Sequence, residues 1–304
     1  MNKRIFLFFL LLSGISMYPQ ERENQPLNII AIGAHPDDID SRFGGTAALY
    51  SKMGHNVKFL ALTNGDAGHT EMGGGVLAKV RREEAKRAGE ILGVEYEVLD
   101  NHDGELMPSL HVRHQVIRKI REWDADVVLG LRPNDYHPDH RNAGIVVQDA
   151  AYLVIVPNVT PDTPPLEKNP VFLYMQDNFQ KPNPFSKDIA VVIDEVVDLK
   201  IQALAAHESQ MFEWLPWTRG VEESEIPKGN KERLAWLKER YTNRYTKNGN
   251  FDEEARNAIQ KWYPSPDLSK VDHVEFFEVC EYGMQPTEEE IRQLFPMLGS
   301  KVSE

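Results

Sequence analysis

The sequence predicts an α/β fold, a mostly parallel sheet with helices on both faces. Three observations lead to this prediction. Short continuous apolar runs recur along the chain, segments of roughly 10 to 18 residues with helical periodicity separate them, and polar clusters follow the runs. A strand that is buried on both faces reads as a continuous apolar run. Strands that alternate with helices form βαβ units around a parallel sheet.

The beginning of the chain is the most regular part. Residues 27–34, LNIIAIGA, form an apolar run typical of a buried strand, and 44–54 follows as a helix that ends in glycine. The next pair repeats this order, with a strand over 55–63 and a helix over 76–93 that again ends in glycine. Glycine is the residue that most often closes a helix, so both helix ends are well marked.

The alternation continues through the middle of the chain. A short strand at 96–100, a helix over 109–123 and the apolar strand ADVVLGL at 125–131 come next. The proline-rich stretch at 156–170 predicts a loop, because strand and helix patterns resume directly after it. These later elements are two strands and a helix, at 172–176, 188–194 and 195–210.

Residues 21–304 are expected to form one domain with a C-terminal extension that begins at about 211. The extension is rich in aromatic and charged residues, and it holds four of the five tryptophans: Trp214, Trp217, Trp236 and Trp262. We expect its helices, and a strand around 273–282, to wrap the sheet or to shape a pocket.

The first 20 residues, MNKRIFLFFLLLSGISMYPQ, have the pattern of a secretory signal peptide. Lys3 and Arg4 precede an apolar run from Ile5 to Leu12, which is too short to span a bilayer. The prediction is an exported protein, periplasmic or secreted, without a stable membrane anchor after cleavage. A buried N-terminal helix is the alternative.

The net charge of −13 argues against anionic partners. Nucleic acids and anionic membrane surfaces bind to basic faces, so neither is expected here. The predicted partner is a small-molecule or glycan substrate, and the sequence predicts no oligomeric state.

Four polar clusters follow the first four predicted strands. In chain order they read HPDDID, NGDAGHTEMGGG, DNHDGEL and RPNDYHPDH. Ligands bind outside the carboxyl ends of the strands in open parallel sheets, so we expect the clusters to meet at one edge. A helix cap and a turn would explain one such cluster, but four indicate a functional site.

The first and fourth clusters contain a repeated pair of ligand-type residues. His35 and Asp38 are three residues apart, with a proline after the histidine, and His137 and His140 repeat this spacing. One histidine and one carboxylate from the first cluster, with one histidine from the fourth, make a set of two histidines and one carboxylate. Hydrolytic zinc sites have such sets and keep a position open for water.

The remaining groups of these clusters suggest proton transfer. Asp37 lies beside Asp38, where a carboxylate would deprotonate the attacking water and later protonate a leaving amine. If His140 binds the metal, His137 is spare, and as an imidazolium it would stabilise a tetrahedral oxyanion. Asp139 would then orient His137 and raise its pKa.

These motifs resemble the PIG-L/LmbE-like family of zinc-dependent N-acetyl deacetylases, which act on N-acetylglucosaminyl compounds and related amides. The resemblance covers most of residues 27–210. It rests on these segments, in the family's order: AHPDD (34–38), GGT (44–46), LTNGDAG (62–68), RREEAKRAGEILGV (81–94), DGEL (103–106), HPDH (137–140) and KIQALAAHESQ (200–210). Many members have glutamate directly after HPDD, whereas this chain has Ile39 and then Asp40.

The resemblance implies a Rossmann-like fold and a role for each matched residue. The implied zinc ligands are His35, Asp38 and His140, with iron(II) as an alternative metal. Asp37 is implied as the general base, and His137, supported by Asp139, as the group that polarises the carbonyl or stabilises the oxyanion.

Two substrate contacts are also implied. Arg81 is similar in position to the family arginine that reaches the sugar or acyl end of the substrate, with Arg82 as the neighbouring alternative. Asp103 stands at the family's DG position, where a contact with the substrate at the rim is expected.

The function expected from the sequence is a metal-dependent hydrolase that removes the acetyl group from an N-acetylated amino sugar or glycoconjugate and releases acetate. The alternatives are an amidase that acts on a non-sugar N-acyl substrate and a catalytically silent, glycan-binding relative. A non-haem iron oxygenase also uses two histidines and one carboxylate. The βα alternation and the spare Asp37 argue against an oxygenase, and the complete set of site residues argues against a silent relative.

Overall fold

The computed structural model describes residues 25–242, 251–264 and 267–299. The predicted signal peptide, residues 1–20, lies outside these residues. None of the helices within the described ranges has the length and apolarity needed to cross a bilayer.

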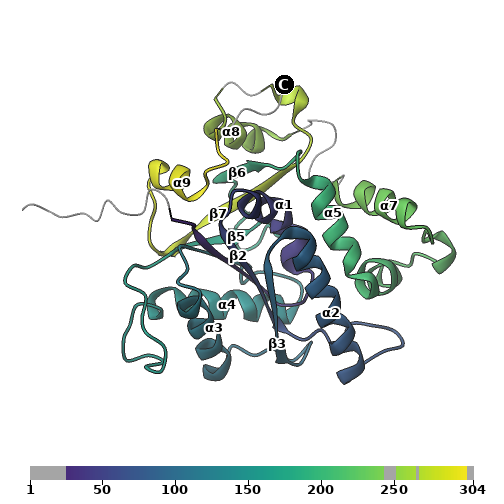
Figure 1. Ribbon diagram of the computed structural model, residues 1–304, viewed down its shortest axis with the longest axis horizontal. Coiled ribbons are helices and arrows are strands. Elements are labelled where there is room, and N and C mark those ends of the chain that lie inside the picture. Colours follow the sequence, from purple (N-terminus) through teal and green to yellow (C-terminus); the bar gives the residue numbers. More distant parts are fainter. Residues whose placement is uncertain (1–24, 243–250, 265–266, 300–304) are drawn as a thin grey trace, which may run out of the picture.

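Seven strands form one sheet in the order β3-β2-β1-β4-β5-β7-β6 (Figure 1). The pairs among β1 to β5 are parallel, and β7 is antiparallel to both β5 and β6, which confirms the predicted mostly parallel sheet. The central strands are almost fully buried, as strands covered on both faces must be. The strands are β1 (Asn28–Gly33), β2 (Asn56–Thr63), β3 (Glu95–Asn101), β4 (Val127–Gly130), β5 (Val171–Met175), β6 (Ile189–Val192) and β7 (Val274–Gly283).

Helices cover both faces of the sheet. α1, α2 and α5 pack together on one face, and α3 and α4, at the lower left of Figure 1, pack together on the other. The α-helices of the described residues are α1 (Asp38–Lys52), α2 (Gly74–Leu92), α3 (Leu110–Glu122), α4 (Pro138–Leu153), α5 (Val197–Ala206), α6 (Leu215–Thr218), α7 (Asn230–Thr242), α8 (Glu253–Trp262) and α9 (Glu288–Leu294). A π-helical turn (Ser209–Trp214) and two 3₁₀ turns (Glu223–Glu225 and Leu268–Lys270) complete the described helical segments.

Helix α1 begins at Asp38, six residues before the predicted start at 44. Two acidic residues, Asp38 and Asp40, lie in its first turn, where negative charge is stabilised by the helix dipole. The polar cluster after β1 is therefore the first turn of a helix and not a long loop. This brings Asp38 to the end of β1, close to the loop after β4.

The direction in which the chain winds reverses between β1 and β4. From β1 the sheet grows toward β2 and β3, and from β4 it grows toward β5. Loops that leave neighbouring strands in opposite directions open a crevice at their carboxyl ends, which is where ligands bind in such sheets. HPDDID follows β1 and RPNDYHPDH follows β4, so the two ligand-rich clusters flank this crevice.

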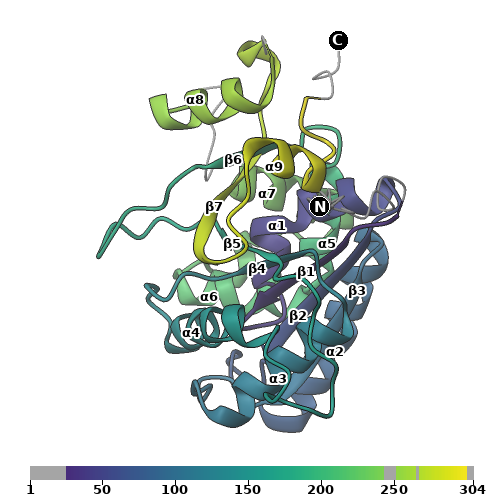
Figure 2. The ribbon, with the colours of Figure 1, turned by 90° about the vertical axis from the view of Figure 1, so that its left-hand side faces the viewer.

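The C-terminal extension does more than wrap the sheet. Its strand β7 lies inside the sheet, between β5 and β6, and α8 and α9 lie beside this end of it (Figures 1 and 2). Glu275 of β7 is buried and accepts hydrogen bonds from the backbone N–H groups of Gly45 (2.9 Å) and Thr46 (2.8 Å) in α1. Lys200 of α5 also donates to Glu275 (2.7 Å), so the extension is fixed to the first helix of the fold.

Candidate active site

A cavity of about 540 Å³ opens at the carboxyl ends of β1 and β4. Residues of all four predicted polar clusters line it, so the expectation that the clusters meet at one edge of the sheet is confirmed. The loop after β5 and the π-helical turn close the remaining sides. Cavities of this size hold small-molecule ligands and cofactors.

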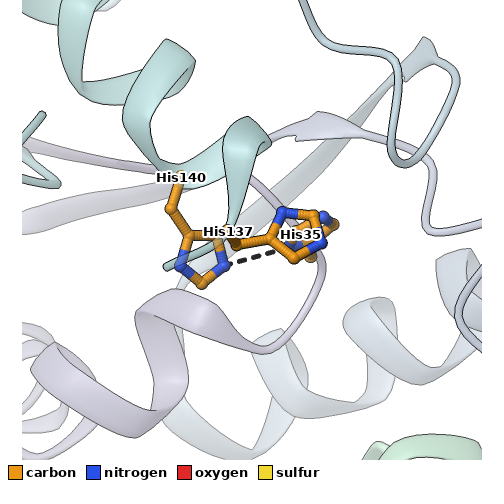
Figure 3. A group of neighbouring side chains, drawn as sticks. All are labelled: His35, His137 and His140. Atoms are coloured by element: carbon orange, nitrogen blue, oxygen red, sulfur yellow. Dashed lines mark hydrogen bonds between the residues drawn. The ribbon is translucent and has the colours of Figure 1, made fainter. Parts of the chain in front are cut away.

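His35, Asp38 and His140 point at one another at the bottom of this cavity. His35 Nδ1 lies 3.2 Å from His140 Nε2, as the dashed line in Figure 3 marks. One carboxylate oxygen of Asp38, Oδ2, lies 3.5 Å from His35 Nδ1. The other, Oδ1, lies 3.2 Å from His140 Nε2. Two imidazole nitrogens and a carboxylate that face one point fit a divalent metal ion. His137 also lies within ligand reach, since one ring nitrogen of each histidine falls within 4.8 Å of the others.

Each of the two facing histidines has a second carboxylate behind it. His35 Nε2 lies 2.9 Å from an Asp103 oxygen, and His140 Nδ1 lies 3.1 Å from an Asp135 oxygen. A carboxylate on the far ring nitrogen fixes the orientation of a metal-binding histidine and makes it a better ligand. The pattern therefore assigns His35 Nδ1 and His140 Nε2 as the nitrogens that would meet a metal.

Asp37 is held in a strained backbone conformation beside this set. Its φ of 133° lies in a region that side-chain-bearing residues rarely adopt, and such strain collects at functional sites. Arg81, which is buried, donates to the Pro36 carbonyl and has a guanidinium nitrogen 3.5 Å from the Asp37 carboxylate. Burial raises the pKa of Asp37 to about 6, although the charge of Arg81 acts in the opposite direction. A carboxyl group with a pKa near neutrality suits a general base.

A chain of buried polar groups supports the backbone of Asp37. The Tyr96 hydroxyl accepts a hydrogen bond from the Asp37 N–H (3.0 Å) and donates to Asp40 Oδ2 (2.9 Å). The other Asp40 oxygen lies 3.3 Å from His207 Nε2, and both Asp40 and His207 are fully buried. These contacts place Asp40 and His207 behind the strained residue.

One predicted contact is wrong. The Asp139 carboxylate accepts hydrogen bonds from the N–H groups of Gly104 (2.7 Å) and Leu106 (3.2 Å), so it does not orient the His137 ring. His137 Nδ1 instead accepts from the Asp139 backbone N–H (3.2 Å) at the start of α4, which leaves the proton of the neutral ring on Nε2. The charge of Asp139 acts to raise the pKa of His137, as expected, but burial and the neighbouring histidines outweigh it and lower this pKa on balance. His137 is therefore a neutral hydrogen-bond donor.

The two arginine candidates lie in different environments. Arg81 lines the cavity, whereas Arg82 is partly exposed on the other side of α2 and pairs with Asp100. Of the two, only Arg81 has a position from which it can act on the site. Asp103 lines the cavity as expected, and it also backs His35, a contact that the sequence did not reveal.

Sequence reasoning missed Asp135 and Tyr96. Asp135 lies in the cluster RPNDYHPDH, and its side chain accepts a hydrogen bond from the His137 N–H (3.0 Å). Aspartate commonly makes such a turn contact with the backbone N–H two residues later in the chain. That spacing is a signal that was available in the sequence. Tyr96 lies on β3, 59 residues from its partner Asp37, and carries no local signal.

The chain is similar in sequence to several known proteins. A family model described as GlcNAc-PI de-N-acetylase (PIG-L) matches residues 30–151. A diacetylchitobiose deacetylase from Thermococcus kodakarensis is 34% identical over 230 residues, which cover 70% of this chain and 83% of that protein. A 4-oxalmesaconate hydratase from Pseudomonas putida is 25% identical over 66% of this chain and 81% of its own length. A probable N-acetyl-alpha-D-glucosaminyl L-malate deacetylase from Bacillus cereus is 27% identical over 69% of this chain and 94% of its own.

Solved structures agree on the fold. The N,N'-diacetylchitobiose deacetylase of Pyrococcus horikoshii is similar with a TM-score of 0.59 at 24% identity, over 83% of each chain. The hydratase GalB of Pseudomonas putida has a TM-score of 0.60 at 19% identity, over 86% of this chain and 99% of its own. The identity with the Thermococcus deacetylase, together with the family model that matches residues 30–151, shows that the chain belongs to the PIG-L family.

Proposed function

We propose that this protein is a zinc-dependent deacetylase that removes the acetyl group from an N-acetylated amino sugar and releases acetate. The observation that carries the proposal is Asp37, a partly buried carboxyl group of near-neutral pKa beside a set of two histidines and one carboxylate. The relatives support an amino sugar, because two of them are named for deacetylating diacetylchitobiose and N-acetyl-alpha-D-glucosaminyl L-malate.

Zinc suits the spacing of the donor atoms. Tetrahedral zinc with bonds of roughly 2.0–2.2 Å holds its ligand atoms about 3.3 to 3.6 Å apart. His35 Nδ1 and His140 Nε2 lie 3.2 Å apart, one Asp38 oxygen lies 3.5 Å from His35 Nδ1, and the other lies 3.2 Å from His140 Nε2. When bound, the metal would polarise the acetyl carbonyl and acidify a nearby water molecule. Iron(II) accepts the same donors, so metal analysis of the purified protein distinguishes the two.

The chain's own groups would then move the proton. Asp37 takes a proton from the attacking water and returns it to the amide nitrogen as the C–N bond breaks. Arg81 limits the rotation of Asp37, since it contacts both the carboxylate and the neighbouring Pro36 carbonyl. His137, with its proton on Nε2, donates to the carbonyl oxygen as that oxygen gains negative charge.

The charge of the cavity favours an uncharged sugar over a polycarboxylate. Five aspartates and three arginines line it, so a bound divalent cation brings its formal charge to zero. A substrate with several carboxylates, as the hydratase relative's name implies for that enzyme, needs a net positive field. Hydration of an unsaturated acid is therefore the second candidate, supported by that relative and opposed by the charge balance.

Acetate release from N-acetylglucosamine and from chitin oligosaccharides tests the proposal. Wild-type protein loaded with zinc should release acetate, and Asp37→Asn should lower kcat by about 10² to 10⁴-fold while the metal content stays unchanged. Asp162→Asn is the matched control, because this aspartate is exposed and pairs with Arg118 far from the cavity. Hydration of an unsaturated dicarboxylate without any acetate release would replace the deacetylase proposal by the hydratase.

We also propose that the protein is exported. The support is the sequence of residues 1–20 alone, with its basic start and short apolar run. N-terminal sequencing of protein recovered from a producing cell should find a new terminus near residue 21. An intact Met1 on protein from the cytoplasm would contradict export.

A further inference from the structure

Two stacked tryptophans stand at the mouth of the cavity. Trp214 lines the cavity, and Trp217 stacks on it with ring centroids 5.2 Å apart and planes 18° from parallel. The two residues are three apart in a helical segment, a spacing that brings side chains together on one face. Leu215 and Arg219, which flank Trp217 in the sequence, also line the cavity.

Trp217 is 60% exposed although one face of its ring is covered by Trp214. An exposed tryptophan places a large apolar surface in water, which is unfavourable unless something covers it. Tyr136, which is 73% exposed, lines the same cavity from the loop after β4. Of these two exposed rings, Tyr136 therefore lies beside His137 and His140, and Trp217 lies behind Trp214, the ring that lines the cavity.

The segment that carries the tryptophans is rigidly attached to the rest of the site. Ser209 donates to the buried carboxylate of Glu84 through both its N–H and its hydroxyl, at 2.7 Å each. Gln210 donates to the Gly68 carbonyl (2.9 Å). Glu213 lies 2.6 Å from His69 Nε2. Because these contacts join the π-helical turn to α2 and to the loop after β2, the rings are held in place before any ligand binds, which lowers the entropic cost of binding.

We propose that the Trp214–Trp217 stack is a subsite for a second pyranose ring, so that the substrate is a neutral N-acetylated oligosaccharide and not a monosaccharide. The proposal rests on the proposed deacetylase function. The sugar that loses its acetyl group lies at the bottom of the cavity, and the next sugar lays its apolar face on the outer face of Trp217. A planar apolar ring suits the C–H face of an equatorially linked pyranose. The neutral charge of the loaded cavity suits an uncharged glycan.

The test compares chain lengths in the metal-loaded protein. For wild type, kcat/KM should rise from N-acetylglucosamine to N,N'-diacetylchitobiose and N,N',N''-triacetylchitotriose. Trp217→Ala should reduce kcat/KM for the two longer sugars by about tenfold, the loss expected from one aromatic contact, and leave the monosaccharide unchanged. Trp217→Phe keeps a ring and should restore most of the difference. An equal loss on all three sugars, or no loss on any, would overturn the subsite.

Tyr152→Ala is the matched control. Tyr152 is 70% exposed and lies near the end of α4, about 18 Å along the helix from His140. Its removal should change none of the three rates. If Tyr152→Ala also lost the preference for the longer sugars, an exposed ring far from the cavity would affect activity as much as Trp217, and this result would count against the proposal.

Binding separates the subsite from the reaction. In the Asp37→Asn background, which prevents turnover, calorimetry should show chitotriose binding that Trp217→Ala weakens by about tenfold. If wild type releases no acetate but this difference in binding remains, the proposed reaction fails and the subsite stands. If chitotriose does not bind, or binds equally to both proteins, the subsite fails whatever the reaction is.

Discussion

Two clusters of buried charge in this protein differ in how their groups are satisfied. Inside the sheet, the carboxylate of Glu275 accepts from two backbone N–H groups, from the Thr46 hydroxyl and from the Lys200 ammonium group. At the carboxyl edge, His35, Asp38 and His140 crowd together so that two ring nitrogens face each other at 3.2 Å. The first cluster is complete within the chain, whereas the second is arranged around a point that the chain itself does not fill.

Whether the protein itself supplies all the partners of a buried charged group distinguishes a structural cluster from a functional one. A buried charge with all its partners supplied by the protein contributes to stability or specificity of the fold. Side chains that converge on a point gain their full set of partners only when a cation binds there, so metal binding adds to the stability of the folded protein. Changes in the two clusters should therefore have opposite signatures.

The largest effect is expected at the edge of the sheet. His140→Ala should abolish stoichiometric zinc binding and lower kcat/KM by more than the roughly 10- to 100-fold cost of losing an outer partner of a ligand. In the metal-free state the variant leaves Asp38 and Asp135 without the imidazole that they contact, so its free energy of unfolding should fall, but by less than that of Glu275→Ala, because both carboxylates keep other partners. Elemental analysis, kinetics and urea titration measure these quantities. A metal-free variant much less stable than metal-free wild type would remove the distinction between the two clusters.

The interior cluster should respond in the reverse way. Glu275→Ala leaves Lys200 and two N–H groups without their acceptor, and should lower the free energy of unfolding by about 3 kcal/mol. Zinc content and kcat/KM per folded molecule should stay unchanged. Glu288→Ala is the control, since this glutamate is exposed and pairs with Lys261. A selective loss of activity in Glu275→Ala would show that the interior cluster also serves the site.

A smaller effect is expected from the support of Asp37. Tyr96→Phe removes the hydroxyl that accepts from the Asp37 N–H, and should lower kcat by about tenfold with KM and zinc content unchanged. Tyr263→Phe is a matched control, because that buried hydroxyl likewise accepts a backbone N–H, from Val192 (3.0 Å), on the far side of the sheet. If both variants lose stability equally and neither changes kcat, Tyr96 has only a structural role.

The smallest effect is expected on the surface. Although burial raises the pKa of Glu97, hydrogen bonds from Lys119 and Lys58 lower it below its usual value of 4.5 on balance. A lowered pKa in the folded state stabilises the protein above pH 4.5, and this contribution disappears as the pH falls through the folded-state pKa. Glu97→Gln should therefore cost about 0.5 kcal/mol at pH 7 and less at pH 3. Urea titrations at the two pH values test this, and a cost that does not depend on pH would point to lost packing.

The sequence predicted what depends on local pattern and on strand order. The apolar runs predicted the strands, and the position of HPDDID and HPDH after two of them predicted that these clusters meet at one edge of the sheet. It failed where a role depends on a distant partner. Asp139 lies two residues from His137, and local reasoning paired their side chains, but the carboxylate reaches Gly104 and Leu106 in another loop.

Long-range pairing also explains what the sequence left open in the C-terminal part. A strand around 273–282 was expected to wrap the sheet or to shape a pocket with the helices of the extension, and periodicity cannot reveal that it enters the sheet between β5 and β6. The register that it adopts depends on Glu275 meeting α1, some 230 residues earlier. Contacts of that separation leave no trace in a local pattern.

The place of β7 has a consequence for synthesis. Until residues 274–283 have left the ribosome, a nascent chain exposes the edge of β5 that pairs with β7 in the finished fold. β6, which pairs with β7, then has no partner strand. An unpaired apolar edge recruits other strands and promotes aggregation. The sheet can therefore close only after translation has passed these residues, so a stalled or truncated product should depend on chaperones in a way that the finished polypeptide does not.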